Sequence, residues 1–533
     1  MASDIDTHET PGGAGPGARQ SGLDAIRRTV DRVFDVTDPE SPQSRSAVLI
    51  VWGVWTALLL ILILSHEMWR DELQSWGLVR SSGTPFDVIT NLRHEGHPPL
   101  WYLVLWPITK ITRSPVGLQV VALVVGSSAA WITLRKMPVS LVMRSAIVFS
   151  YFPLFEMGTI SRSYSLLWLL AVTASWLANR PQTPNWMIAV ALTAVASTTV
   201  LAIPLTIAMA IGIWGGPWFA SPRRGPLNIR WVGLFTVVPL AAAAIALPAV
   251  GGGPQADVAR LSTTKIGASF AAVLHVAFPV TNAVDGFWGR FLVRGWTTWG
   301  PLLGMAIVVF MAWCLRRSRT ALTIWIGSTL GFLVVLVATG VGMEPRRISP
   351  LWAGAIAAVW FAAADRRARP PVSRTSIPIL TRVAIAAVLV ASLWAAAWAT
   401  KVDVSIPFSG SAAAADWIEA QAGGDDFVIL CAINAAMCSS VSIRLDVPAY
   451  TSATSEPFTF VDWRPGWAKT PKAGEVPAMA STLAQRTGKK VFIVAPAAGY
   501  PLGCQNGGKP PKRFVTEFMV VCRADQLVTF PTK

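Results

Sequence analysis

Ionisable side chains that could take part in proton transfer are crowded between residues 66 and 102. This stretch holds three of the five histidines of the chain together with several carboxylates, and it directly follows an apolar run at 46–65 that is long enough to cross a bilayer. Ionisable groups at a membrane surface lose hydration, so crowding them there is costly without a function. The acidic pair Asp71 and Glu72 is suited to general-base chemistry. We therefore predict a reaction centre here; the alternative is a solvated loop with incidental ion pairs.

The elements that must position this loop are membrane-spanning helices. The chain is 53% hydrophobic and 14% charged, whereas soluble proteins carry about 25% charged residues. A crossing needs about 20 apolar residues. We expect about eleven transmembrane helices, at 46–65, 116–134, 141–158, 163–179, 186–199, 200–219, 231–249, 298–315, 321–342, 349–365 and 381–399. The predicted fold is thus an all-α polytopic membrane domain over residues 46–399.

Arginine clusters predict the orientation of these helices, because cytoplasmic loops carry the excess of positive charge. The net charge is +16, and its placement beside apolar runs favours membrane lipids over nucleic acid as the partner. The clusters expected to be cytoplasmic are Arg135, Lys136 and Arg144; Arg223 and Arg224; Arg316, Arg317 and Arg319; and Arg366, Arg367 and Arg369. The segments 66–115, 159–162, 250–297 and 343–348 then face outward from the plasma (inner) membrane. Parity requires that 98–113 dips into the outer leaflet; a true crossing would put Arg135 outside.

Both ends of the chain differ from this membrane domain. Residues 1–45 are polar and read as a cytoplasmic tail, with a helix on the membrane surface as one reading of its last part. Residues 400–533 alternate helical stretches with short apolar strands, which predicts an extracytoplasmic α/β domain. This domain holds four of the five cysteines, which predicts two disulfides in an oxidising compartment. Among three connectivities we favour neighbour pairing, Cys431–Cys438 and Cys504–Cys522; a zinc site lacks accompanying histidines.

Three short motifs resemble those of one enzyme superfamily. Asp71-Glu72 soon after the first span, followed by Pro98-Pro99-Leu100-Trp101-Tyr102, resembles the first outer loop of GT-C glycosyltransferases. The likeness is closest to protein O-mannosyltransferases and lipid A aminoarabinose transferases. The stretch Ser161-Arg162-Ser163-Tyr164-Ser165-Leu166 resembles the "Arg-x-Tyr-x-Leu" of the second outer turn, and Glu344-Pro345-Arg346-Arg347 resembles a basic turn before a late span. The resemblance covers about the first 400 residues in layout.

The resemblance implies an inverting transfer of sugar from a polyprenyl-phosphate donor to an extracytoplasmic acceptor, which is a glycan, lipid or protein. Asp71 would be the base, supported by Glu72. Cations would meet the charge of the leaving phosphate. The implied donor-phosphate residues are Arg162, His97, Arg346 and Arg347, and the implied substrate contacts are Arg70, His94, Glu95, Tyr164 and Trp101. His97 stands where the aminoarabinose enzymes have a lysine, and it would bind phosphate strongly only when protonated.

Other readings of these residues stay open. His94, Glu95, His97 and Asp71 could bind a divalent ion, although His-Glu-Gly-His lacks the i, i+4 spacing of a helical zinc motif; we predict no metal ligand and no certain cofactor. A transporter or lipid flippase would also use charged residues, but transporters usually show repeated halves. A non-catalytic relative would act through its soluble domain. Retained Asp71 and Arg162 favour the enzyme.

Overall fold

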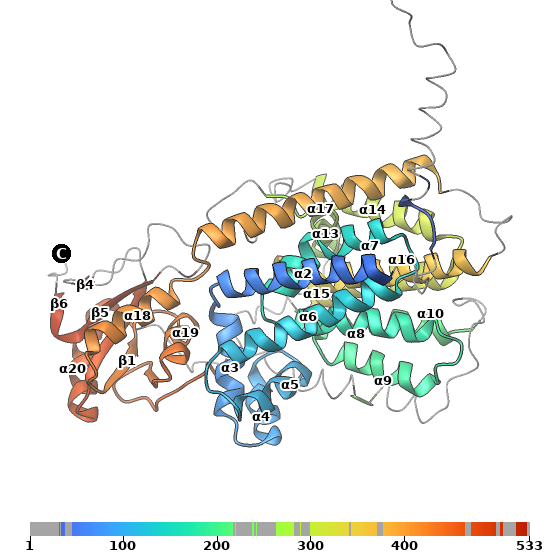
Figure 1. The fold of residues 1–533 in the computed structure, drawn as a ribbon. Helices are drawn as coiled ribbons and strands as arrows, with labels where there is room; N and C mark the ends of the chain where they lie inside the picture. Colours follow the sequence, from blue (N-terminus) through green and yellow to red (C-terminus); the bar gives the residue numbers. More distant parts are fainter. Residues whose placement is uncertain are drawn as a thin grey trace, which may run out of the picture.

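The computed structural model is mostly helical and ends in a small mixed sheet (Figure 1). It describes residues 31, 33–37, 45–216, 219, 237–238, 241, 263–281, 288, 299–339, 343–369, 377–463, 471–496, 502–504, 517 and 519–529.

The membrane domain is a bundle of helices that run alongside one another (Figure 1). Its helices are α2 (Arg45–Ser65), α3 (Arg70–Ser81), α4 (Pro85–Asn91), η2 (Leu92–His94), α5 (Leu100–Thr109), α6 (Val116–Lys136), α7 (Leu141–Val148), the π-helix η3 (Phe152–Thr159), α8 (Ser163–Ala178), α9 (Asn185–Ala196), η4 (Val200–Ala202), α10 (Ile203–Trp214), α12 (Thr263–Ser269), α13 (Ala271–Ala277), α14 (Trp299–Leu315), α15 (Arg319–Thr339), α16 (Pro345–Ala368) and α17 (Ile379–Ser405).

Five of these helices are long and apolar enough to cross a membrane: α2, α6, α15, α16 and α17. The pair α7 and η3 makes a sixth if it is one span bent by 44°. Helices α8, α9 and α14 are apolar but shorter, and most of the span predicted at 231–249 lies outside the described residues. A membrane protein with five or six candidate spans is therefore what the structure supports, and the count of eleven remains a prediction.

The outer surface of the bundle is apolar, as lipid contact requires. Helix α2 buries Trp55 and Leu59 against its neighbours, while Ile50 and Leu64 are 67% and 70% exposed. Helix α17 likewise leaves Ile379 70% exposed. Large exposed aliphatic side chains in rows are unusual on soluble proteins, and they mark surfaces that meet an apolar partner.

The basic turns after α6 and α16 lie at one end of the bundle. Thr37 Oγ1 donates to the Val139 carbonyl at 2.8 Å, and Arg366 donates to the Phe34 carbonyl at 3.3 Å. Arg382 pairs with Asp31. These contacts bring the described N-terminal residues to the turns after α6 and α16, so these basic turns share one face as predicted; which face is cytoplasmic remains a prediction.

The segment 66–115 lies at the opposite end and contains α3, α4 and α5. Helix α5 has 10 residues, and at about 1.5 Å per residue it spans about half of a bilayer core. It cannot cross a membrane by itself, which agrees with the prediction for 98–113.

Residues from Ser411 onward form the predicted small α/β domain. Its helices are α18 (Ser411–Ala422), α19 (Ala435–Leu445), η8 (Ala473–Glu475), α20 (Val476–Thr487) and η9 (Ala524–Gln526), and its strands are β1 (Phe427–Cys431), β2 (Ala449–Tyr450), β3 (Lys490–Pro496), β4 (Leu502–Cys504), β5 (Met519–Arg523) and β6 (Leu527–Thr529). The main sheet has the order β2-β1-β3-β5, with β5 antiparallel and the other pairings parallel. Helices α18 and α19 pack on one face and α20 packs on the other. Successive side chains of β1 and β3 therefore point to opposite faces of the sheet and contribute to two separate cores.

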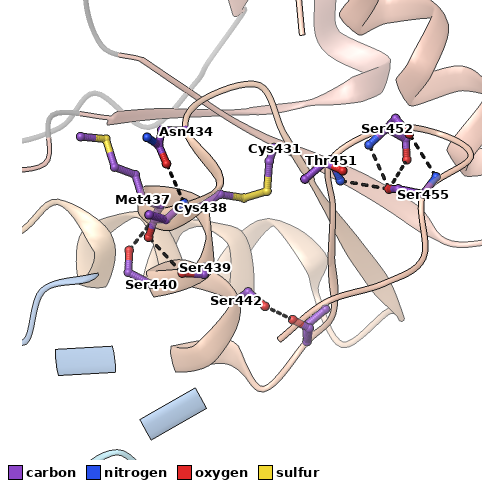
Figure 2. Close-up of a disulfide and its surroundings, with 12 residues drawn as sticks. Cys431, Asn434, Met437, Cys438, Ser439, Ser440, Ser442, Thr451, Ser452 and Ser455 are labelled. Atoms are coloured by element: carbon purple, nitrogen blue, oxygen red, sulfur yellow. Dashed lines mark hydrogen bonds between the residues drawn. A yellow bond between two sulfur atoms is a disulfide. The ribbon is translucent and has the colours of Figure 1, made fainter. Parts of the chain in front are cut away.

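A disulfide joins the end of β1 to the start of α19 (Figure 2). Cys431 and Cys438 are bonded and buried, and the Asn434 side chain caps α19 between them by accepting from Ala436 N–H at 2.9 Å. The first predicted pairing is therefore confirmed. Cys522 is also disulfide-bonded; the side chain of Cys504, its predicted partner, lies outside the described part of the chain.

The α/β domain packs directly on helix α3. A Cβ added to Gly77 would lie 2.6 Å from Ile443 Cδ1 and 2.8 Å from the Thr459 carbonyl oxygen, so the two surfaces meet closely at this glycine. Asp446 forms ion pairs with Arg113 at 2.7 Å and with Arg80 at 3.2 Å. The loop and the domain consequently lie at the same end of the bundle.

Candidate functional site

Helix α3 begins at a cap that holds its first turn rigidly. The Glu72 carboxylate accepts from Trp69 N–H at 3.2 Å and from Ser161 N–H at 2.6 Å, and it pairs with His66 at 3.0 Å. Glu72 is 0% exposed. Both of its oxygens therefore serve to position the loop, and the side chain is not exposed to a substrate. Its supporting role is to hold Asp71 in place.

His66 joins three elements at this end of the bundle. Its other ring nitrogen contacts Asp403 at 3.0 Å, near the end of α17. Burial alone would lower the pKa of His66, but the carboxylates of Asp403 and Glu72 outweigh it and raise this pKa to about 10. His66 is thus an imidazolium that neutralises two buried carboxylates, and it ties α2, α3 and α17 together.

Asp71 lies among guanidinium groups. Its carboxylate is 3.0 Å from Arg346 Nη2 and 3.5 Å from Arg70 Nε, while Arg162 donates to its backbone carbonyl. Burial raises the pKa of Asp71, yet Arg346, Arg162 and Arg70 together hold it well below its ordinary range. The carboxylate, with a side chain 22% exposed, is ionised at any physiological pH.

Arg346 is held by aromatic rings as well as by carboxylates. Its guanidinium carbon lies 4.6 Å from the Trp69 ring centroid and 4.8 Å from that of Trp288. Glu344 pairs with it at 2.8 Å and with Arg347 at 3.6 Å. Stacked rings keep a planar guanidinium oriented while leaving its edge available for an oxyanion.

The surroundings of His97 do not favour the phosphate contact predicted for it. Its Nδ1–H donates to the Glu95 carbonyl at 3.0 Å, so its Nε2 accepts from Arg162 Nη2 at 3.2 Å. Burial, and then Arg162, lower the pKa of His97 to about 3. A neutral His97 does not meet phosphate with a charge of its own; it orients Arg162, which also donates to Ser75 Oγ at 3.0 Å.

Glu95 is a second carboxyl in the same cluster. Gln74, one turn after Asp71 on α3, donates to it at 3.1 Å and also to the Val461 carbonyl of the α/β domain at 2.8 Å. Burial raises the pKa of Glu95 to about 7, although Gln74 opposes this. Glu95 therefore titrates near neutral pH and can exchange a proton there.

The remaining predicted site residues lie either at the edge of this cluster or in the apolar cores of the protein. His94 pairs with Asp462 of the α/β domain at 2.9 Å, at the edge of the cluster. Trp101 and Tyr164 are buried in the apolar cores. Within the described ranges no three His, Cys, Asp or Glu side chains lie together as metal ligands.

The sequence reading missed three residues near this cluster. Glu517 of the α/β domain accepts from Arg70 N–H at 3.1 Å, and burial raises its pKa to about 7. Trp288, from the predicted outer segment 250–297, stacks on Arg346. Glu156 joins this cluster through Trp288, because its carboxylate accepts a hydrogen bond from Trp288 Nε1 at 2.6 Å. A lone acid inside the apolar run 141–158 was the available signal for Glu156.

No family model, curated protein or solved structure matches this chain. The site must therefore be interpreted from its own geometry, which is a set of buried or half-buried guanidinium groups gathered around Asp71 where several helices end.

Proposed function

We propose that the chain is a membrane glycosyltransferase that moves a sugar from a polyprenyl-phosphate donor to an extracytoplasmic acceptor. The observation that carries this proposal is the convergence of three arginines on Asp71: Arg70 and Arg346 pair with its carboxylate, and Arg162 donates to its backbone carbonyl. Several guanidinium groups gathered at one point suit a site for a phosphate at a membrane surface. The GT-C-like order of the motifs points to the same chemistry.

In this proposal the donor phosphate takes over Arg346 from Asp71. Arg347 lies beside it; its side chain is 20% exposed and pairs with Glu344 at 3.6 Å. Asp71, released from its strongest partner, then accepts the proton of the acceptor hydroxyl. The acceptor oxygen bonds to the anomeric carbon from the opposite face as the bond to phosphate oxygen breaks. The electron pair of the broken bond leaves with the polyprenyl phosphate, whose charge the arginines stabilise.

The location of the protein follows from the same proposal. Lipid-linked donors are confined to a bilayer, so the site would lie at the outer face of the plasma (inner) membrane with the α/β domain beside it. The partners would be the polyprenyl-phosphate sugar, the surrounding lipids and a glycan, lipid or protein acceptor. No step in this scheme requires a divalent ion.

The experiment is to measure polyprenyl-phosphate binding and sugar release with the purified protein in lipid nanodiscs. Arg346→Ala should weaken binding at least tenfold, because a charge-assisted contact contributes about 1.5–3 kcal/mol. Arg180→Ala is the matched control, since Arg180 stacks on Trp176 past the other end of α8. Equal binding by both variants would contradict the phosphate site. Binding with lipid translocation but no transfer would favour a flippase, and binding with neither would favour a non-catalytic relative.

A further inference from the structure

Glu156 is a fully buried carboxyl, and one of its oxygens has no partner among the residues that the structure describes. Its Oε1 accepts from Tyr151 O–H and from Trp288 Nε1–H, both at 2.6 Å. Its Oε2 makes no hydrogen bond within the described part of the chain, although the residue is 0% exposed. Whether the carboxyl is ionised or protonated, the described residues leave a hydrogen bond of this oxygen unmet.

Such a group is costly where it lies. The carboxyl is on η3, part of a candidate membrane span, and burying a polar atom without a partner costs free energy. The local backbone is also uncommon, because η3 is a π-helix of eight residues. Single π-helical segments inside helices occur frequently at functional sites. A group that only packed the bundle would not need either feature.

The neighbours of Glu156 connect it to the phosphate site. The Trp288 ring that donates to Glu156 also stacks on Arg346 at 4.8 Å and packs edge-on against Trp69 with centroids 4.8 Å apart. Trp69 is 1% exposed, and its Nε1 has no partner in the described part of the chain. One unmet acceptor and one unmet donor therefore flank the same indole ring, beside the guanidinium proposed to hold the donor phosphate.

We propose that Glu156 recognises the sugar of the donor, with Glu156 Oε2 accepting a hydrogen bond from a sugar hydroxyl and Trp288 packing against the sugar ring. A hydroxyl both donates and accepts, so it can also accept from Trp69 Nε1. An aromatic face next to a carboxylate matches the apolar and polar faces of a pyranose or furanose. This inference rests on the proposed function and adds a specificity residue to it.

The competing explanation is that Glu156 only fastens Tyr151 and Trp288 in the bundle. The two can be separated, because a structural fastener would affect every ligand alike. Glu156→Gln keeps the shape and the Oε1 acceptor, and it replaces only the free oxygen by an amide. Tyr151→Phe is the matched control, since it removes one hydrogen bond to Oε1 and leaves Oε2 unchanged.

The test measures affinity in nanodiscs for polyprenyl phosphate and for a panel of polyprenyl-phosphate hexoses and pentoses, together with the melting temperature. Glu156→Gln should weaken binding of the preferred glycosylated donor at least tenfold, leave binding of bare polyprenyl phosphate within twofold and melt like the parent. Tyr151→Phe should change neither affinity by more than twofold.

The inference is overturned if Glu156→Gln binds glycosylated and bare lipid as the parent does, or loses both equally. It is also overturned if Tyr151→Phe reproduces the loss, because fastening would then explain the effect. Failure of the parent protein to bind any polyprenyl phosphate is a separate result that contradicts the proposed function itself.

Discussion

Replacing Asp71 by asparagine should slow sugar transfer and at the same time strengthen binding of the donor. Asparagine keeps the shape and removes the base, so transfer to a hydroxyl acceptor should fall at least ~100-fold, the usual contribution of a general base. The ion pair with Arg346 at 3.0 Å disappears in the same step. At an effective dielectric constant of about 20 such a pair is worth about 4 kcal/mol before any discount. Because the Asp71 side chain is 22% exposed, a net value nearer to about 1.5 kcal/mol is reasonable.

The phosphate of the donor no longer has to displace that carboxylate in Asp71→Asn. We therefore expect the affinity for polyprenyl phosphate to rise roughly tenfold while turnover collapses. Equilibrium binding in nanodiscs and single-turnover sugar release measure the two quantities on one preparation. Glu72→Gln is a different perturbation, because Glu72 caps α3 and neutralises His66; it should lower the melting temperature first. Parental turnover by Asp71→Asn would refute the assignment of the base, and weakened donor binding would refute the competition.

Three further outcomes can be measured on the same protein. Gly77→Ala should loosen the α/β domain from α3 and expose it to limited proteolysis, whereas Gly53→Ala, where a Cβ meets nothing within 4 Å, should leave the digestion pattern unchanged. Glu95→Gln should remove a step near pH 7 from the pH–rate profile. Because the folded pKa of Glu95 is raised to about 7, its contribution to stability is present below about pH 4.5 and is lost as the pH rises to about 7. Thermal melts of the variant at pH 4.5–7 should lack that loss. Breaking the Cys431–Cys438 bond by serine substitution should cost roughly 2–3 kcal/mol, the loop-closure estimate for a short loop, seen as a lower melting temperature that reductant changes less than it changes that of the parent, because Cys522 is also disulfide-bonded.

Local patterns in the sequence were sufficient for much of the fold. Apolar length predicted α2, α6 and α15, because a span must satisfy its backbone within one helix. Short continuous apolar runs between helical stretches predicted β1 and β3, because a strand between two helical layers buries both faces. These features depend on neighbours in the chain, so the chain itself carries them.

The roles within the site depend on contacts between distant segments, which no local pattern encodes. His97 is neutral because its ring is buried and because Arg162 lies against it, both of which lower its pKa. Glu72 is structural because His66 and the Ser161 N–H surround it. Glu517 reaches the site only because the α/β domain packs on α3. An acidic pair in the sequence therefore indicates a site, whereas the fold decides which member supports and which can react.

The pairing of Asp71 with Arg346 also bears on the order of binding in the proposed reaction. With the phosphate site unfilled, Arg346 needs a counter-ion, and Asp71 and Glu344 at 3.0 and 2.8 Å provide it. A carboxylate held in this way has a pKa well below its ordinary range and is a weak base. The donor is a phosphodiester that carries one negative charge, as a carboxylate does. Its arrival at Arg346 would take over this pairing, release Asp71 and thereby raise the basicity of Asp71. An acceptor that arrived first would meet a base that is still neutralised by arginine. Donor binding would therefore precede activation of the acceptor, and hydrolysis or transfer without a seated lipid phosphate would be suppressed.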